Sequence, residues 1–308
     1  MILKHLINSK SFVIFFIIIF LLALNITPFI RHSFFNVYDN LFFNPIIEYV
    51  FGTLLVFINA MKLNNIIYEK SIIRKNNLVV ASVFLLLNTF FINNLLYLIH
   101  CYVILVFLDI LFASYQKKYP FSNFFNSGLV IGFLSLFFLN LITCYIIILV
   151  TGITFNNLNW RTFIASLIGL IIPFIFYFMF LFSLEITTFS TYILPLFNTE
   201  QKILYSSSSL FMIISFILSF CLSIRELFGW IYKKSIRSRK SFIVILSFLC
   251  ICIAIFIISN YTILYFFIIP FSIIIANYLI YYRNRIIAEL VFLLLIGSSF
   301  IYRYMIIL

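Results

Sequence analysis

Charged residues are scarce in this chain of 308 residues, where they make up only 9% of the sequence. A soluble domain carries roughly 25% charged residues, so no water-facing globular surface can be built here. Hydrophobic residues make up 65% of the chain, the mean hydropathy is +1.22, and apolar runs recur along the whole length. The sequence therefore predicts an all-α fold, a polytopic transmembrane helical bundle that forms a single integral membrane domain over 1–308.

Acidic residues and catalytic motifs are also scarce. Asp and Glu together number eight, and the chain has no Gly-Lys-Ser/Thr phosphate loop, HExxH, GxSxG or CxxC motif. ATP-driven and zinc chemistry are therefore not expected, and no resident metal is predicted from these residues. The five cysteines lie inside apolar runs without the histidine spacing of a metal site, so we expect small buried side chains.

Positive charge is the one abundant kind, and its placement indicates a membrane rather than a nucleic acid as partner. The net charge is +12, but Lys and Arg gather at the ends of apolar runs. The densest stretch, 232–240, holds five of the twenty Lys and Arg residues. Short basic loops stay on the cytoplasmic side of a membrane. The expected partner is the lipid bilayer, with an added attraction to anionic headgroups.

Counting spans from this basic stretch gives a topology. Each crossing needs about 20 residues. We expect spans near 11–30, 45–61, 78–92, 95–114, 162–184, 208–224, 242–258, 264–281 and 287–302. The first run resembles a signal peptide, but it lacks a small-residue cleavage site and is interpreted as a retained span.

The segment 126–155 fits either one long tilted helix or two short helices. One helix would put 232–240 outside, against the charge rule, so we predict a hairpin turning near Asn140. The total is then about eleven spans (range 9–11), with a cytoplasmic N-terminus. Inner segments hold seventeen Lys and Arg residues, and outer segments hold three, namely Arg31, Lys202 and Arg303.

Two prolines and two glycines mark helix packing. Pro173 and Pro270 fall in mid-span, where each removes a backbone hydrogen bond and favours a kink, either for packing or beside a cavity. Gly128 and Gly132 are four residues apart, a spacing that permits close approach of a second helix.

Asp39 and Glu48 are the acidic residues best placed for chemistry. They lie around the first outer loop and the head of the second span, together with Arg31 and His32. A carboxylate at the membrane boundary can act as a general base or hold a divalent cation, whereas a structural Asp39 would only cap a turn. Glu185 opens a later outer loop, where it is solvated or, with Arg31 and His32, contacts a substrate.

Asp109 lies deep in its apolar run, where an ionisable group is costly and needs a partner or a wet cavity. His100 precedes it by nine residues, which at about 100° per residue puts the two side chains on opposite helix faces. They are not expected to form a dyad. Pairing of Asp109 with Arg161 or Arg225 and a proton-relay role both stay open.

Several short motifs carry a resemblance to known families. They are the opening Met-Ile-Leu-Lys-His-Leu, the run Phe-Phe-Asn-Ser-Gly-Leu-Val-Ile-Gly-Phe-Leu-Ser-Leu at 124–136, and Asn159-Trp160-Arg161 followed by Gly169 and Pro173. Together they resemble an uncharacterised family of multi-spanning inner-membrane proteins from Bacteroidota, over most of the chain. The resemblance implies a multi-pass protein of the bacterial inner (cytoplasmic) membrane.

The same order of features is more remotely similar to GT-C-type glycosyltransferases, which use polyprenyl-phosphate sugars. Those enzymes have an acidic residue in the first outer loop, which Asp39 matches here. They also have a Gly-rich hairpin, matched by Gly128, and a proline on a later span, matched by Pro173. This chain departs from them in its short outer loop and in lacking a basic residue after the hairpin. The resemblance implies Asp39 as base or metal ligand, a divalent cation as cofactor and a lipid-linked sugar as substrate.

The sequence leaves three functions open. The first is a GT-C-like glycosyl or glycan transferase that works on a polyprenyl-phosphate-linked substrate at the outer face. The second is a non-catalytic membrane subunit of an envelope-assembly or protein-export complex, with other envelope proteins as partners. The third is a transporter, for which intramembrane polar residues are few and internal repeats are not detected.

Overall fold

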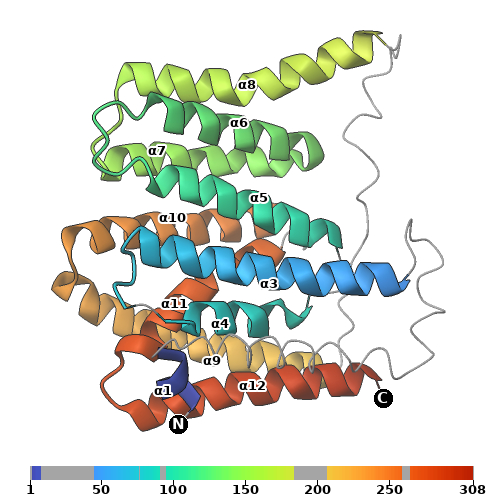
Figure 1. The fold of residues 1–308 in the computed structure, drawn as a ribbon, viewed down its shortest axis with the longest axis vertical. Coiled ribbons are helices and arrows are strands. Elements are labelled where there is room, and N and C mark those ends of the chain that lie inside the picture. The colour runs from blue at the N-terminus through green and yellow to red at the C-terminus, as the bar shows by residue number, and fades with distance from the viewer. Residues whose placement is uncertain are drawn as a thin grey trace. The chain divides into compact units, whose positions relative to one another are not determined.

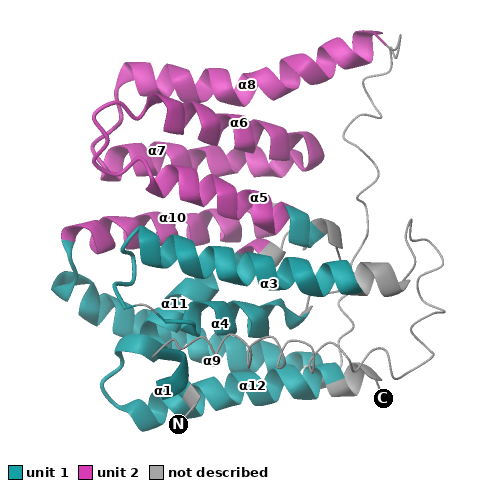
Figure 2. Ribbon diagram, viewed as in Figure 1, with its two compact units in different colours: residues 1–99, 203–235, 267–308 teal, residues 100–202, 236–266 magenta. Residues whose placement is uncertain are grey.

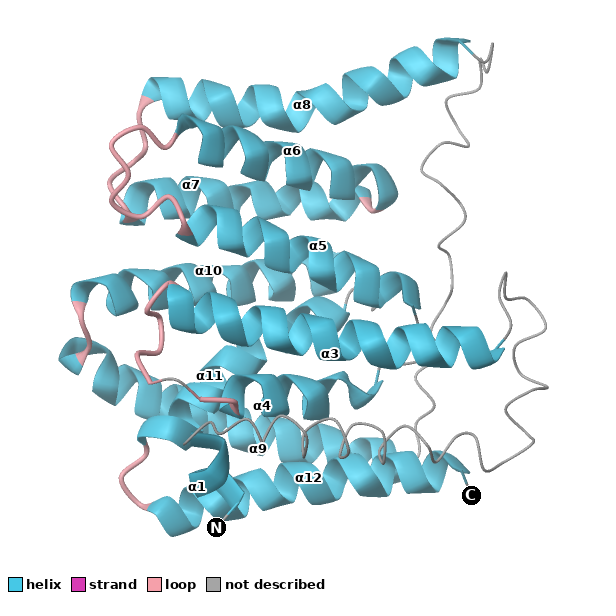
Figure 3. Ribbon diagram, viewed as in Figure 1, coloured by secondary structure: helices cyan, strands magenta, loops and turns pink. Residues whose placement is uncertain are grey.

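The computed structural model describes residues 2–7, 45–75, 77–90, 95–183, 207–258 and 264–307. Within these residues all regular structure is helical (Figure 3). The α-helices are α1 (Ile2–Ile7), α3 (Pro45–Glu69), α4 (Val79–Leu87), α5 (Leu95–Phe112), α6 (Phe121–Phe137), α7 (Tyr145–Thr154), α8 (Trp160–Ser183), α9 (Ser207–Trp230), α10 (Ile236–Ile258), α11 (Ile268–Tyr281) and α12 (Arg285–Ile307). Short 3-10 helices are η3 (Asn88–Phe90), η4 (Leu139–Cys144), η7 (Ile231–Lys233) and η8 (Leu264–Phe267).

Among the residues that the structure describes, five helical stretches are long and apolar enough to cross a membrane. They are Val50–Glu69, Trp160–Ser183, Ser209–Lys233, Ile236–Phe256 and Arg285–Arg303. Four further apolar stretches are shorter, namely Tyr97–Phe112, Phe121–Phe137, Leu139–Thr154 and Ile268–Tyr281. The predicted all-helical class is confirmed for the described residues, and these apolar helices are consistent with a membrane protein. Eleven crossings and their direction stay predictions.

The chain divides into two compact units (Figure 2). Unit 1 comprises Met1–Ile99, Ile203–Ser235 and Phe267–Leu308, and unit 2 comprises His100–Lys202 and Ile236–Phe266. The single membrane domain expected over 1–308 stays a prediction, and each unit is described by itself.

Unit 1 is built around two short helices that are apolar on all sides. Every residue of α4 is buried, and so is nearly all of α11. A helix that is hydrophobic all round belongs inside a bundle rather than at its surface. The neighbours that cover this pair are α3 on α4 and α9 on α11, while α12 packs on α9.

Unit 2 is held together by an unusually close helix pair, α6 and α8. A Cβ built on Gly132 would lie 3.1 Å from Cγ of Pro173, and one built on Gly169 would lie 3.0 Å from the backbone nitrogen of Leu129. A Cβ on Gly128 would collide with the carbonyl oxygen of Ser166. The expected close approach at Gly128 and Gly132 is therefore confirmed, and α8 contributes Gly169 to it.

The segment 126–155 is divided as predicted. Helix α6 ends at Phe137, Phe138 adopts an extended backbone (φ −135°, ψ 99°), and η4 leads into α7. The break therefore falls beside Asn140, and α6 begins earlier than expected, at Phe121. Helices α6 and α7 contact each other within unit 2.

Several helices run further into basic segments than we predicted. Helix α3 continues to Glu69 rather than ending near Met61, and α10 begins at Ile236 rather than near Phe242. The aliphatic stems of Lys and Arg can lie along a helix while their charges reach the interface, so basic residues do not end these helices. The basic stretch 232–240 therefore contains only a short non-helical connection, at Lys234 and Ser235.

Candidate functional site

The residues predicted to form an outer-face site are mostly outside the described part of the chain. Arg31, His32, Asp39 and Glu185 all lie there. Glu48 falls in the first turn of α3. Their convergence on one site therefore stays a prediction.

Arg303 is a functional candidate that sequence reasoning treated only as one of three outer basic residues. It lies in the last turns of α12, and only 4% of its surface is exposed. Figure 1 shows the end of α12 at the same end of unit 1 as the start of α3, which carries Glu48. A guanidinium stays charged at any physiological pH, so a nearly buried one needs hydrogen-bonding or ionic partners. Arg303 could have been singled out from the sequence because it interrupts an apolar run.

The opposite end of unit 1, here called the basic end, holds a cluster of basic, amide and aromatic side chains. The ammonium of Lys234 donates a hydrogen bond to Oδ1 of Asn277, a residue of α11 that is 2% exposed. It also lies 5.1 Å from the ring centroid of Tyr281, and the Lys75 ammonium lies 5.5 Å from the same ring. The Trp230 ring packs at 4.8 Å from that of Tyr281. Cation–π contacts of this kind hold the lysines against the helix ends.

Burial makes Lys234 unusual among the described lysines. It sits between the apolar stretches Ser209–Lys233 and Ile236–Phe256, and desolvation lowers its pKa from 10.5 to about 7. At neutral pH the side chain is thus poised between its charged and neutral forms. Sequence reasoning identified the basic segment but not this residue within it.

Unit 2 has polar contacts of its own where α5 meets α6. Lys117 donates from Nζ to Oδ1 of Asn123 at 2.9 Å, and Asn123 donates from Nδ2 to the carbonyl oxygen of Ile110 at 2.8 Å. The guanidinium of Arg237 lies 5.3 Å from the Tyr115 ring centroid. These contacts satisfy polar groups at helix ends, and none of them forms a catalytic arrangement.

His100 and Asp109 occupy different surroundings along α5. His100 is 5% exposed and packs edge-on against the rings of Phe137 and Phe138, with centroid distances of 5.7 and 5.1 Å. Asp109 is partly exposed. Arg161, a predicted partner of Asp109, lies with its guanidinium 5.4 Å from the ring of Trp160. Pairing of Asp109 with Arg161 or Arg225 stays a prediction.

Within the part of the chain that the structure describes, no group of three or more His, Cys, Asp or Glu side chains is placed to hold a metal ion. No protein-family model, curated protein or solved structure matches the chain. Its function is therefore inferred from its own residues.

Proposed function

We propose that the chain is a multi-pass protein of the bacterial inner membrane that transfers a glycosyl or glycan group from a polyprenyl-phosphate carrier at the outer face. The proposal includes a GT-C-like arrangement and membership of the Bacteroidota inner-membrane family named above. The observation that carries it is the nearly buried Arg303 at the end of unit 1 where α3 begins.

The charges at this end suit a lipid-linked phosphate. A guanidinium binds phosphate oxygens with two parallel hydrogen bonds, and its attraction strengthens where water is excluded. Glu48 stands in the first turn of α3, and Asp39 precedes it by a few residues in the chain. An acidic residue beside a cationic phosphate site supplies either a general base or a ligand for a divalent cation.

The proposed reaction is a nucleophilic substitution at the anomeric carbon of the lipid-linked sugar. An acceptor hydroxyl attacks the anomeric carbon of the lipid-linked sugar and forms the new glycosidic bond. Its proton passes to the carboxylate of Asp39. The bond between the anomeric carbon and the phosphate oxygen breaks, and the polyprenyl phosphate leaves with the additional negative charge, which Arg303 stabilises.

The orientation is supported by where the basic residues gather in unit 1. Lys75 follows α3, Lys233 ends η7, and Arg285 begins α12, at the end opposite to Arg303 (Figure 1). Retention of positive charge in the cytoplasm puts this basic end inside and Arg303 outside.

Complementation of a deletion strain tests the proposal, with membrane abundance measured on blots. We expect Asp39→Asn and Arg303→Gln to accumulate normally but keep the null phenotype, because one loses the base or metal ligand and the other the phosphate site. Lys202→Gln, which removes another outer positive charge, should complement fully. Full complementation by both Asp39→Asn and Arg303→Gln would overturn the transferase proposal.

A second candidate, a non-catalytic membrane subunit, is favoured by the surface of α8. This helix packs on α6 and exposes large apolar side chains around the rest of its length, including Phe176 at 69% and Phe182 at 87%. Such a surface suits lipid or the helix of a partner. A subunit requires the α8 surface rather than Asp39, so Phe176→Ser would then lose complementation while Asp39→Asn kept it.

A further inference from the structure

Three basic side chains gather around one aromatic ring, that of Tyr281, at the basic end of unit 1. The ammonium groups of Lys75 and Lys234 lie 5.5 and 5.1 Å from the centroid of this ring. The Tyr281 side chain also interacts electrostatically with that of Arg74, and it lies against the backbone of Arg74 and Lys75. These four residues, Arg74, Lys75, Lys234 and Tyr281, are called the Tyr281 cluster below. Like charges held this close repel one another, and an anion bound among them relieves the repulsion.

Positive charge exceeds negative charge around this cluster. Glu226 of α9 interacts electrostatically with Tyr278 of α11, in the turn before the cluster. Against this carboxylate stand Arg74 and Lys75, which are both exposed, and Lys234, whose pKa burial lowers to about 7. The side chains of Arg74 and Lys75 can therefore donate charge-assisted hydrogen bonds to an anion that approaches from outside the protein.

The surroundings of the cluster suit a ligand that is apolar at one end. The Trp230 and Tyr281 ring centroids are 4.8 Å apart. Trp and Tyr are the side chains that concentrate at the level of lipid headgroups. Trp230 is the last residue of α9, and Phe228, two residues earlier, is 59% exposed. A molecule that combines an anionic group with an apolar chain therefore fits this end of α9.

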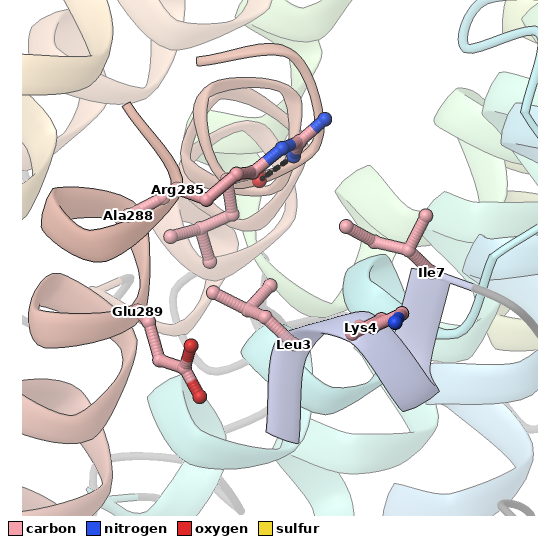
Figure 4. A pocket seen from close by; sticks show the side chains of 7 residues that line it. Leu3, Lys4, Ile7, Arg285, Ala288 and Glu289 are labelled. Atoms are coloured by element: carbon pink, nitrogen blue, oxygen red, sulfur yellow. Dashed lines mark hydrogen bonds between the residues drawn. The ribbon is translucent and has the colours of Figure 1, made fainter. Parts of the chain in front are cut away.

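A cavity of about 280 Å³ at the same end of unit 1, between α1, α11 and α12, carries its charges differently (Figure 4). Its charged lining residues are Lys4, Arg285 and Glu289. The Arg285 guanidinium donates from Nη1 to the carbonyl oxygen of Ile280 at 2.9 Å, so it already serves the C-terminal end of α11. Positive and negative side chains share this cavity, which makes it a reference for the more strongly positive Tyr281 cluster.

We propose that the Tyr281 cluster binds the phosphate diester of an anionic phospholipid, such as phosphatidylglycerol, in the cytoplasmic leaflet. Arg74 and Lys75 donate hydrogen bonds to the phosphate oxygens, Lys234 adds positive charge, and an acyl chain lies along α9 at Phe228. Phosphatidylcholine carries the same phosphate but also a quaternary ammonium, which the basic side chains repel. Inorganic phosphate lacks the apolar chain. The inference rests on the membrane placement and orientation proposed above and not on glycosyl transfer.

Native mass spectrometry of the full chain in detergent tests the proposal, with dioleoyl phosphatidylglycerol or dioleoyl phosphatidylcholine added at equal concentration. We expect wild type to bind phosphatidylglycerol about tenfold more tightly, the difference that one charge-assisted hydrogen bond provides. Lys75→Gln should reduce this preference to about threefold or less, because it removes one such bond. Lys4→Gln, the same charge change at the neighbouring cavity, should leave the preference unchanged. Excess inorganic phosphate, compared with chloride at equal ionic strength, should not displace the lipid.

Tyr281→Leu separates a specific site from diffuse attraction, because it removes the ring that supports the lysines but changes no charge. We expect it to reduce the preference as Lys75→Gln does, whereas diffuse attraction would leave the preference at the wild-type value. Each variant is compared with wild type by size-exclusion profile. Equal binding of the two lipids by wild type, an equal loss of preference in Lys4→Gln and Lys75→Gln, an unchanged preference in monodisperse Lys75→Gln and Tyr281→Leu, or displacement of the lipid by phosphate overturns the proposal. None of these outcomes depends on complementation by Asp39 or Arg303 variants.

Discussion

At the scale of single residues, the charged side chains of unit 1 differ in how far they leave water. Lys75 is exposed and extends over the Tyr281 ring, whereas Lys234 is partly buried beside the same ring and bonds to the buried Asn277. Arg303 is nearly enclosed. Burying a charged side chain costs desolvation free energy, and the cost increases with burial. The more deeply buried charges therefore need a structural or functional explanation.

Lys234 gives a pH-dependent prediction. Its pKa is about 7 in the folded protein, against 10.5 as its ordinary value, so between these pH values the unfolded chain binds more protons. Stability contributed by this group therefore rises as the pH increases from about 7 to about 10. We expect the melting temperature of the detergent-solubilised protein to rise over that interval by a few degrees more in wild type than in Lys234→Met. Lys75→Met, at the exposed lysine, should keep the wild-type slope. Parallel melting curves for wild type and Lys234→Met would contradict this assignment.

The candidate site could be predicted only in part at this scale. Sequence reasoning found the acidic residues and the basic segment because both stand out against an apolar background. It missed the burial of Arg303 and the contact of Lys234 with Asn277, since these residues are far apart in the chain and meet only through packing. A lone Asn in an apolar run, such as Asn277, was a signal that could have been used.

At the scale of elements, the contact between α6 and α8 depends on glycine at three positions. Gly128 and Gly132 on α6 and Gly169 on α8 allow the two backbones to approach so closely that a Cβ at any of the three would meet the backbone of the other helix. Pro173 lies in the same contact, so its missing N–H falls where α8 already meets α6 rather than beside lipid alone. Packing is therefore the role that the structure gives to these residues.

Gly128→Ala tests this contact with a single methyl group. The added Cβ would collide with the backbone carbonyl of Ser166, so α6 and α8 must separate, and we expect a loss of about 1–3 kcal/mol as in overpacked cores. Thermal unfolding in detergent measures the change. Gly229→Ala on α9 and Gly297→Ala on α12 are matched controls, because a Cβ there meets nothing within 4 Å. Alanine also favours helix over glycine, so the controls should be neutral or slightly stabilised. Equal melting temperatures for Gly128→Ala and the two controls would contradict the packing model.

Helix positions were more predictable than helix ends. Hydrophobic runs and the charge rule located the described helices from α3 to α12 and the break near Asn140, because lipid demands long apolar segments and cytoplasmic loops retain positive charge. The short helix α1 was not predicted. The ends at Glu69 and Ile236 were misplaced, because we ended helices where basic residues begin. Snorkelling side chains remove that limit.

At the scale of the whole molecule, exposed apolar helices occur together with a basic end of unit 1 and a nearly buried Arg303 at the opposite end of that unit. Large apolar side chains exposed on α8 and α9 would associate in water, and in a bilayer they face lipid. The division into two compact units was not predictable from hydropathy, which gives the length of each apolar run but not its neighbours.

The central claim is that the basic end faces the cytoplasm while Arg303 and the first outer loop face outward. The most direct measurement uses paired reporters: green fluorescent protein or alkaline phosphatase inserted at Ser235 or fused after Leu308, in intact cells. We predict fluorescence without phosphatase activity at Ser235, and phosphatase activity without fluorescence after Leu308. The reverse pattern, or cytoplasmic signals at both positions, would contradict the orientation and with it the outer-face site.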